Sequence, residues 1–544
     1  MNPHTLPVNS TDTADITLLL EGTYPYVRGG VSSWVHQIIR GLPELRFALV
    51  FLGGDSAHYG AMKYTLPDNV IHLECHYLME TSPSDGHPQS TPRAHRGKTQ
   101  PFADIARLHD YLRAPESGLP ADGLPGLLAC TIARLGTPEG IRHEDFLHSE
   151  HAWESIRRDY TRFCTDPSFV DFFWTVRSMH APLFMLANIA RKIPPTRILH
   201  AISTGYAGFL GMLLCQQRQC PFILTEHGIY TKERKIDLTH ADWIKDAGET
   251  FGGGLDDDVS YIRRLWIRFF EGIGRLTYAT ADPVIALYEG NRQRQIADGA
   301  SPAHTRVIPN GIDLTRFAPL RIQRTHNTRH AGIPPVIGLL GRVVPIKDIK
   351  TFIRAMRTVC NHLPNAEGWI IGPEDEDQDY ARECHDLVTS LGLDAQVKFL
   401  GFRKTEDILP QLGLLALTSI SEALPLVILE GFASGLPVLS TDVGACRELI
   451  EGNTEEDRAL GTAGDIVSIA DPEAFARQAL QLLTDTQRWH TAQATGIARV
   501  ERYYTQAMMY ASYRQLYQTA LHKSAGISDI APAATPVGHC TVGS

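Results

Sequence analysis

Short apolar runs, each followed by a glycine-containing turn and an amphipathic stretch, recur along the chain. In the N-terminal half these runs are ITLLLEG (16–22), FALVFLGG (47–54), RILHAIS (197–203) and FILTEHG (222–228). After the first run, VSSWVHQIIRGL places apolar side chains at helical spacing. This alternation is typical of βα units, so it predicts a mostly parallel sheet covered by helices.

The same alternation resumes after residue 334 with five further apolar runs. They are PVIGLLGRV, GWIIGP, VKFLGF, LLALTSI and LPVLSTDV, and helical patterns separate them. The pattern predicts a second doubly wound domain over 335–485. Residues 316–334 are polar and basic and lack periodicity, so we expect a linker there after a first domain over 15–315.

Some segments do not fit a simple βα repeat. Residues 80–195 begin with a stretch rich in Pro, Ser, His and Gly and continue as an aromatic helical pattern, which predicts an insertion in the first domain. Residues 486–522 have helical patterns, and we expect these helices to pack back toward the N-terminal domain. We expect the two ends, 1–14 and 523–544, to be disordered.

Composition narrows the classes of function. The 544 residues carry 51 Lys and Arg against 61 Asp and Glu, a net charge of −10, so no global positive field favours nucleic acid. The nine cysteines are scattered without a CxxC pair, which indicates neither a disulfide framework nor a zinc site. No signal peptide and no apolar run of about 20 residues is found, so we expect a cytoplasmic protein.

The segment GRVVPIKD (341–348) directly follows a predicted strand. Gly341 permits a tight exit that brings backbone close to a ligand. Arg342 and Lys347 then place two cations at the carboxyl edge of the sheet, where a bidentate Arg and a point-charge Lys suit a diphosphate.

The segment SEALPLVILEGFASGLPVLSTDVG (421–444) is the strongest chemical signal. Glu422 lies in the loop after a strand, and Glu430 follows eight residues later on a predicted helix. The amides of Leu426 and Val427 fall near the start of that helix, where unpaired N–H groups and the helix dipole favour an anionic oxygen or a sugar hydroxyl. A carboxylate at position 430 can accept both vicinal hydroxyls of a ribose.

The N-terminal half offers weaker candidates. Gly29 and Gly30 lie between the first strand and its helix, where backbone can approach a phosphate or sugar, although a simple turn explains them equally well. His227 ends a strand and can bond a sugar hydroxyl or polarise a transition state; the alternative is a structural histidine. Asn310 belongs to a turn, IPNGID, that we expect to close the N-terminal domain facing the cleft, and we count it among the candidate donor-binding residues.

Several other chemistries lack their motifs. The acidic runs 256–258 and 374–377 do not form a recognisable metal loop, so we interpret them as solvated clusters and expect no metal. No P-loop, dinucleotide-binding GxGxxG, HExxH or GxSxG sequence occurs, which argues against P-loop NTPases, dinucleotide oxidoreductases and common hydrolases.

Together, GRVVPIKD, the Glu422/Glu430 pair, the N-terminal glycines, His227 and PNGID resemble the retaining GT-B glycosyltransferases of family 4. LLLEGTYPYVRGGVSSWVHQII and EHGIYTKER, with the helical insertion, resemble the glycosyltransferases of Pel-type exopolysaccharide synthesis. The resemblance implies an α/β protein of GT-B fold, in which two Rossmann-like doubly wound domains face an interdomain cleft.

The resemblance also implies an activity. It is the transfer of a hexose or N-acetylhexosamine from a UDP-sugar to a growing polysaccharide, with retention and without a metal or other cofactor. By position, Arg342 and Lys347 hold the diphosphate and Glu430 the ribose. Glu422 and the adjacent amides hold the donor sugar, Gly30 approaches the distal phosphate, and His227 reaches the 6-position of the sugar. The implied partners are Pel synthase components at the inner membrane, where any association is peripheral.

Two alternatives remain open on the sequence. One is an isomerase of the same fold that epimerises UDP-N-acetylglucosamine and forms product without an acceptor. The other is a non-catalytic scaffold that binds a nucleotide sugar for a membrane synthase. UDP release that depends on Glu422 separates the scaffold from an enzyme.

Overall fold

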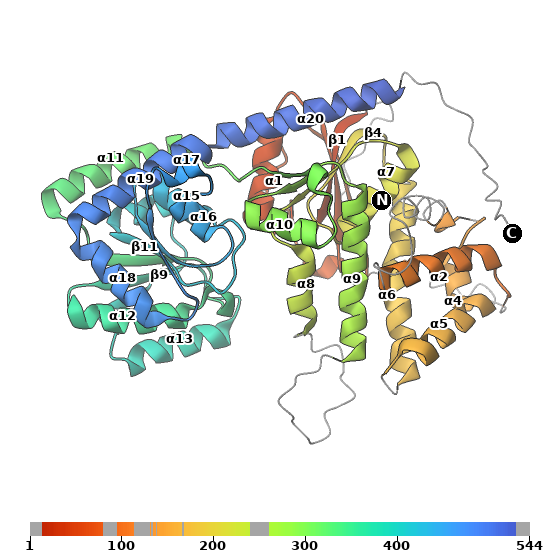
Figure 1. Ribbon diagram of the computed structural model, residues 1–544, viewed down its shortest axis with the longest axis horizontal. Helices are drawn as coiled ribbons and strands as arrows, with labels where there is room; N and C mark the ends of the chain where they lie inside the picture. The colour runs from red at the N-terminus through yellow and green to blue at the C-terminus, as the bar shows by residue number, and fades with distance from the viewer. Residues whose placement is uncertain are drawn as a thin grey trace. The chain divides into compact units, whose positions relative to one another are not determined.

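The computed structural model describes residues 13–79, 95–113, 131, 134–137, 139–165, 168–239 and 260–528. The chain divides into two compact units (Figure 1). Unit 1 comprises Met1–Ile285, Arg294–Arg306 and Arg514–Ser544, and unit 2 comprises Ala286–Gln293 and Val307–Tyr513.

The sheet of unit 1 has seven strands among the described residues, in the order β3-β2-β1-β4-β5-β6-β7. The pairings of β1 with β2 and β4, of β2 with β3 and of β4 with β5 are parallel. Every residue of β2 is buried, as expected for a strand covered on both faces. The strands are β1 (Ala14–Glu21), β2 (Phe47–Gly53), β3 (Val70–Tyr77), β4 (Thr196–Ala201), β5 (Phe222–Glu226), β6 (Val284–Ala286) and β7 (Thr305–Val307).

The first half contains two groups of helices. The βα connections supply α1 (Gly30–Gly41), α7 (Tyr206–Arg218), α8 (Tyr230–Thr239), α9 (Tyr261–Thr280) and α10 (Glu289–Ala297). The predicted insertion, between β3 and β4, supplies α2 (Thr99–Arg113), α4 (His143–His148), α5 (Glu150–Phe163) and α6 (Phe169–Ala190). Its apolar side chains share a core with α7 and α9, so the insertion packs onto unit 1.

The second parallel sheet lies in unit 2, with strands in the order β10-β9-β8-β11-β12-β13. They are β8 (Val336–Leu340), β9 (Glu367–Ile371), β10 (Val397–Phe399), β11 (Leu414–Leu417), β12 (Val438–Thr441) and β13 (Gly464–Val467). Leu414 and Ala416 enter one apolar cluster while Leu415 and Leu417 enter another, because successive side chains of a strand point to opposite faces.

Helices cover both faces of this sheet (Figure 1). One face holds α12 (Ile349–His362), α13 (Gln378–Ser390) and α18 (Pro472–Thr484). The other holds α11 (Leu314–Ala331), α15 (Leu426–Ala433), α16 (Cys446–Glu451) and α19 (Thr486–Tyr503). The described residues also include the short α14 (Thr405–Ile408) and α17 (Glu455–Arg458) and the long α20 (Gln506–Ser528). Two doubly wound parallel sheets confirm the predicted fold class.

The predicted linker at 316–334 is wrong, because α11 occupies most of it. The Asp313 carboxylate accepts the Thr315 N–H and caps the helix, and the buried Arg324 guanidinium donates to the carbonyls of Ser434, Leu412 and Leu409. Phe317 and Leu320 also enter the core of unit 2, so tertiary contacts hold this helix although its sequence has little apolar periodicity. The division between the units falls near residue 307 instead.

The expected disorder at the two ends falls mostly outside the described residues, which begin at 13 and end at 528. Inside them, Ala14 already belongs to β1 and residues 523–528 continue α20, so those parts of the prediction are wrong. Beyond Arg514, α20 belongs to unit 1, where the Tyr517 hydroxyl bonds His200 Nδ1 at 2.7 Å. No helix in the described part of the chain is long and apolar enough to span a membrane.

Candidate functional site

Two loops at the carboxyl edge of the unit 2 sheet are linked by hydrogen bonds. The Thr418 hydroxyl, directly after β11, lies 3.0 Å from each of the carbonyls of Lys347 and Asp348 in the loop after β8. The Ile420 N–H donates to the Ile346 carbonyl at 2.9 Å. The sequence places these loops about 70 residues apart, and the β8–β11 pairing brings them together.

Lys347 and Glu422 meet at this junction. The Lys347 ammonium (Nζ) lies 2.5 Å from Glu422 Oε1, and the Ser419 hydroxyl donates to the same oxygen at 2.6 Å. Their side chains are 23% and 12% exposed, so the two predicted residues form an ion pair that is largely shielded from water. The carboxylate compensates the charge of the ammonium, and the pair fixes the position of both groups at the edge of the sheet.

Arg342 points to a different partner. Its guanidinium donates from Nη1 to both carboxylate oxygens of Glu376, at 2.5 and 2.6 Å, and both side chains are about half exposed. The acidic run 374–377 therefore supplies a counter-charge to Arg342. An exposed pair of this kind contributes only about 0–1 kcal/mol, so an anionic ligand can displace Glu376 at small cost.

Gly372, directly after β9, was not among the residues predicted from the sequence, but the backbone of the loop after β8 lies very close to it. A Cβ on Gly372 would lie 1.9 Å from the Gly341 carbonyl oxygen, whereas one on Gly341 would lie 3.5 Å from Lys347 Cε. The predicted Gly341 thus borders the Lys347 side chain, and its N–H donates to the Ile371 carbonyl at 2.9 Å. A second missed glycine, Gly444, lies under the Glu422 loop: its φ is +55°, and a Cβ there would lie 2.3 Å from the Glu422 carbonyl oxygen.

Helix α15 begins at Leu426, beside that loop, as predicted from the sequence. Pro425 precedes it, and no side chain caps its first turn. The amides of Leu426 and Val427 are the first two of the helix and have no carbonyl one turn earlier to accept them. They therefore present N–H groups and the positive end of the helix dipole at the sheet edge.

Glu430 lies one turn further along α15. Burial raises the pKa of its carboxyl to about 7; Glu406 adds to the shift and Arg316 opposes it. Arg316 itself forms an ion pair with Glu406 and donates to the Thr405 hydroxyl. In the described part of the chain no group donates a hydrogen bond to Glu430, so this carboxyl has its acceptor positions open.

Asn310 belongs to unit 2, so the prediction that its turn closes the N-terminal domain is wrong. The side chain is 5% exposed, and its Oδ1 is buried with no partner among the described residues. The neighbouring Gly311 packs against the joint between α19 and α20, where a Cβ would lie 2.3 Å from the Thr505 carbonyl oxygen. That close approach explains the glycine.

In unit 1, Gly29 and Gly30 start helix α1. Both are exposed, no side chain caps the helix, and a Cβ on either would meet nothing within 4 Å. The two glycines therefore leave open space in front of the first amides of α1, as a backbone that approaches a ligand requires.

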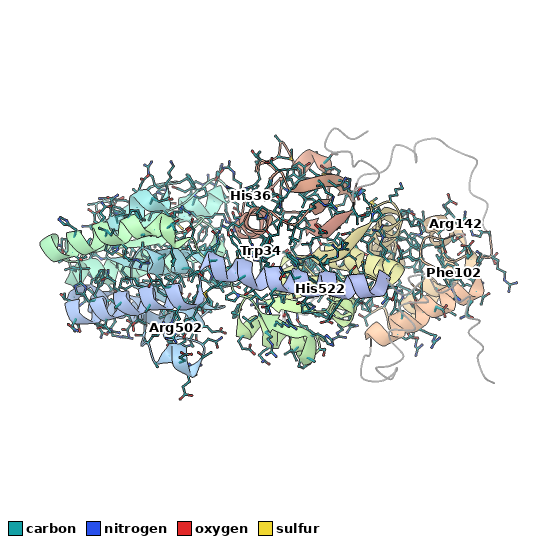
Figure 2. The ribbon with its side chains drawn as sticks, turned by 90° about the horizontal axis from the view of Figure 1, so that it is seen from above. Trp34, His36, Phe102, Arg142, Arg502 and His522 are labelled. Atoms are coloured by element: carbon teal, nitrogen blue, oxygen red, sulfur yellow. The ribbon has the colours of Figure 1, made fainter. Side chains whose placement is uncertain are left out.

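His227 follows β5, and Trp34 of α1 contacts its ring edge to face with 4.7 Å between ring centroids. Figure 2 shows Trp34 on that helix. Burial lowers the pKa of His227 to about 4, so the imidazole is neutral near pH 7, and its Nε2 is buried with no partner among the described residues. His227 can thus donate or accept one hydrogen bond but carries no charge.

Glu226, next to His227, is a buried polar centre that the sequence analysis missed. Its carboxyl accepts hydrogen bonds from the hydroxyls of Tyr278 at 2.6 Å and Thr204 at 3.1 Å and from the Gln295 amide at 3.0 Å. Burial raises the pKa of this carboxyl to about 7, which the hydrogen bonds oppose. An acidic residue directly before the histidine at a strand end was the available signal.

No group of three or more His, Cys, Asp or Glu side chains in the described ranges could hold a metal ion. In the acidic run 374–377, Glu376 pairs with Arg342, and Glu374 lies 2.8 Å from His385 Nε2. The run 256–258 lies outside the described residues.

Comparison with known families follows the division of the chain. Residues 14–303 match a family described as a domain of unknown function (DUF3492), and residues 334–485 match the family described as glycosyl transferases group 1. The second match contains the loops of Lys347 and Glu422 and the whole of α15.

A curated relative is the D-inositol 3-phosphate glycosyltransferase of Corynebacterium urealyticum, 29% identical over 210 residues, which are 36% of this chain and 48% of the relative. The chain spans about half the length of the curated relatives it matches. Two solved structures extend the likeness to the whole fold. HepE of Anabaena, in complex with UDP and glucose, has a TM-score of 0.54 and 17% identity over 93% of this chain and 99% of its own. Sucrose-phosphate synthase of Thermosynechococcus elongatus has a TM-score of 0.55 and 16% identity over 94% and 100%.

Proposed function

Because the chain belongs to the DUF3492 family and carries a glycosyl transferases group 1 domain, we propose that it is a glycosyltransferase with a UDP-sugar donor. The observation that carries the proposal is the edge of the unit 2 sheet, where Lys347, Glu422 and the uncapped start of α15 adjoin. A cation, a carboxylate and open amides on one sheet edge match the diphosphate and the sugar of such a donor.

The roles of the residues follow from their surroundings. Lys347 and Arg342 bind the diphosphate; Arg342 gives up its exposed pair with Glu376 to do so. The open carboxyl of Glu430 accepts the ribose hydroxyls when it is ionised. Glu422, with the amides of Leu426 and Val427, holds the donor sugar.

The mechanism is charge stabilisation. When the anomeric bond breaks, the diphosphate gains negative charge and the sugar gains oxocarbenium character. Cations that are already fixed before the reaction stabilise the leaving group, and one such group contributes about 3 kcal/mol to the rate. We propose retention by attack on the front face, in which a phosphate oxygen of the leaving group takes the proton of the acceptor hydroxyl. This route needs no protein base and no metal.

In unit 1, two groups suit parts of a nucleotide sugar, and we propose them as binding groups. The open amides before α1, at Gly29 and Gly30, suit a phosphate oxygen. The neutral His227, with its buried and unpartnered Nε2, suits one sugar hydroxyl and does not act as a cation. In unit 2, the unpartnered Oδ1 of Asn310 can accept a hydrogen bond from a ligand hydroxyl or N–H group.

For the acceptor and product, we propose a Pel-type exopolysaccharide of the biofilm matrix, the polymer made by systems that contain the glycosyltransferase PelF. The N-terminal signatures LLLEGTYPYVRGGVSSWVHQII and EHGIYTKER support this assignment. The enzyme then works in the cytoplasm, with other synthase components at the inner membrane as partners. The transferred sugar is a hexose or an N-acetylhexosamine.

A panel of UDP- and GDP-sugars tests the proposal by thermal stabilisation and by release of the nucleoside diphosphate. We expect one UDP-sugar to stabilise the protein and to release UDP in a reaction that an oligosaccharide acceptor accelerates. An epimerised UDP-sugar without an acceptor identifies the isomerase instead. If a UDP-sugar binds but no nucleoside diphosphate is released, the protein is the non-catalytic scaffold. If none of these sugars stabilises the protein, it does not bind nucleotide sugars and the proposal is rejected.

A further inference from the structure

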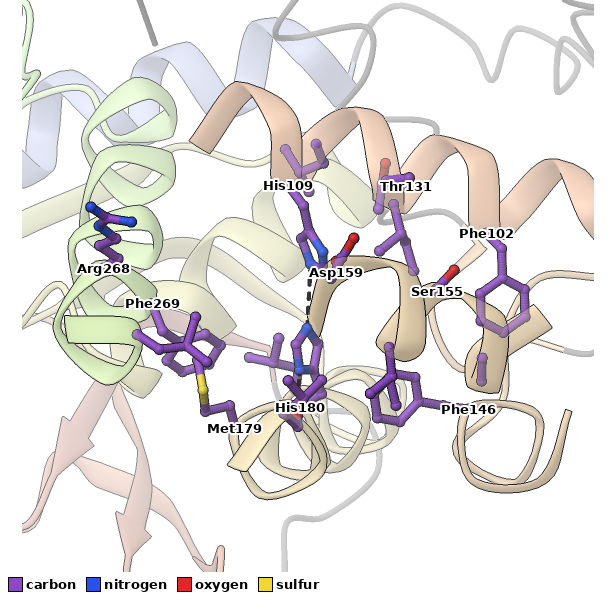
Figure 3. A pocket seen from close by; sticks show the side chains of 18 of the residues that line it. Phe102, His109, Thr131, Phe146, Ser155, Asp159, Met179, His180, Arg268 and Phe269 are labelled. Atoms are coloured by element: carbon purple, nitrogen blue, oxygen red, sulfur yellow. Dashed lines mark hydrogen bonds between the residues drawn. The ribbon is translucent and has the colours of Figure 1, made fainter. Parts of the chain in front are cut away.

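Unit 1 contains a large cavity outside the groups described so far. Helices α2, α4, α5, α6 and α9, with part of α7, surround a space of about 290 Å³ (Figure 3). Most of its lining is aliphatic or aromatic, including Phe146, Phe172, Leu183 and Phe269. Four of these helices, α2, α4, α5 and α6, belong to the insertion between β3 and β4, which is not part of the parallel sheet.

The most conspicuous polar feature of the cavity is a pair of histidines. Nε2 of His109 lies 3.3 Å from Nε2 of His180, and Figure 3 shows the two rings meeting from α2 and α6. His180 Nδ1 lies 2.7 Å from the Val176 carbonyl, which can only accept, so this nitrogen carries the proton. His180 Nε2 is then the acceptor from His109, and burial lowers the pKa of His180, which keeps it neutral. Both ring nitrogens of His180 are therefore already paired.

This lining selects the chemical class of a ligand. A sugar brings several hydroxyls, each of which loses its hydrogen bonds to water when no partner replaces them. An aliphatic chain has no such requirement and gains from the apolar contact. The cavity therefore favours a hydrocarbon chain over a sugar.

The volume sets the length of that chain. An apolar cavity of about 150 Å³ holds benzene, with six carbons. The cavity of unit 1, about 290 Å³, is close to twice that size, so it has room for on the order of a dozen carbons.

Two cations line the cavity at exposed positions. Arg158 on α5 donates to the adjacent Asp159 at 3.3 Å, which neutralises part of its charge. Arg268 on α9 forms no ion pair with any residue in the described ranges, and Figure 3 shows it at one side of the pocket, above Phe269. An anionic head group fits beside Arg268, with the chain directed inward.

We propose that this cavity binds an unbranched hydrocarbon chain of about twelve carbons that ends in a carboxylate or phosphate at Arg268. The site is independent of sugar transfer, since none of its residues belongs to the groups assigned to the donor. The chain comes from a free fatty acid or from a lipid acyl group, and both share this chemistry.

Dodecanoate below its micelle concentration is the first probe, measured on the full chain by calorimetry and native mass spectrometry. We expect one molecule bound per chain and an increase in melting temperature, with no effect of butyrate. Vesicles of dimyristoyl phosphatidylglycerol are the second probe. Lipid carried away from them identifies the acyl group as the source, whereas binding of dodecanoate alone identifies the free acid.

Variants locate the site. Ser155→Phe on α5 and Ala106→Phe on α2 each place a ring in the cavity, and we expect either to weaken dodecanoate binding more than tenfold. Two variants on different helices guard against one that fails to fold. Thr161→Phe adds the same ring at an exposed position of α5 outside the lining and should bind normally.

Arg268→Ala tests the head group: it should weaken dodecanoate about threefold to tenfold and leave methyl dodecanoate unchanged. The proposal is overturned if dodecanoate does not bind, or if the cavity variants and Thr161→Phe bind it equally.

Discussion

Replacing Lys347 by Met removes the ammonium group and keeps most of the apolar stem of the side chain. The ion pair with Glu422 is largely shielded from water, so the lost charge is one that the proposed transition state feels strongly. Loss of one fixed group of this kind costs about 10² to 10³ in turnover, or about 3–4 kcal/mol. The variant leaves the shielded Glu422 carboxylate without its counter-charge, although the hydrogen bond from Ser419 remains, so we expect folding to lose about 3–5 kcal/mol.

The assay is UDP release from the donor that the panel identifies, at saturating donor, with thermal unfolding measured on the same samples. Lys350→Met is the matched control, because Lys350 forms a comparable 2.5 Å ion pair with Glu383 on the α12 and α13 side of the sheet. It should retain turnover within about twofold. If the folded Lys347→Met variant turns over like the wild type, Lys347 does not stabilise the leaving group.

Three other predictions test groups that the structure sets apart. Because burial raises the pKa of Glu430 to about 7 and the ionised form accepts the ribose hydroxyls, affinity for the UDP-sugar donor, whose diphosphate does not titrate in this range, should rise about fivefold to tenfold from pH 6 to pH 8. Titration calorimetry should find that Glu430→Gln removes this rise; a rise that persists in the variant contradicts the assignment. Gly444→Ala should destabilise the protein by about 2–4 kcal/mol and reduce transfer, whereas Gly392→Ala, with a φ of +64° and open space, should cost only about 1–2 kcal/mol in chemical unfolding. The pKa of the Glu226 carboxyl is raised in the folded state, so the contribution of this group to stability is lost as the pH rises toward about 7. The melting temperature should therefore fall more from pH 5 to pH 8 in the wild type than in Glu226→Gln. Equal falls in the two proteins contradict this prediction.

The parts of the fold that the sequence predicts are those with strong local patterns. The unit 2 strands read as apolar runs because β11 and its neighbours are buried on both faces. Strands β6 and β7, with three residues each, are too short for a periodic signal. Helix α11 was missed because few apolar positions mark it: Phe317 and Leu320 enter the core, and the buried Arg324 bonds distant carbonyls.

The candidate site also has parts that the local sequence predicts and parts that depend on tertiary contacts. Residue types and their positions after strands identify Lys347, Glu422 and the start of α15 from the sequence alone. The pairing of Lys347 with Glu422, 75 residues later, depends on strand order, which local patterns do not contain. Likewise, the neutral state of His227 follows from its burial beside Trp34, and the need for Gly444 follows from the path of a neighbouring loop.

The proposed function requires that the edge of the unit 2 sheet binds the nucleotide of a UDP-sugar. Titration calorimetry of UDP into the full chain tests it most directly, with the wild type compared with Lys347→Met, Glu430→Gln and Lys350→Met. We expect one UDP per chain, at least tenfold weaker binding in Lys347→Met and Glu430→Gln, and unchanged binding in Lys350→Met. Absence of UDP binding by the wild type, or equal affinity in all four proteins, contradicts it.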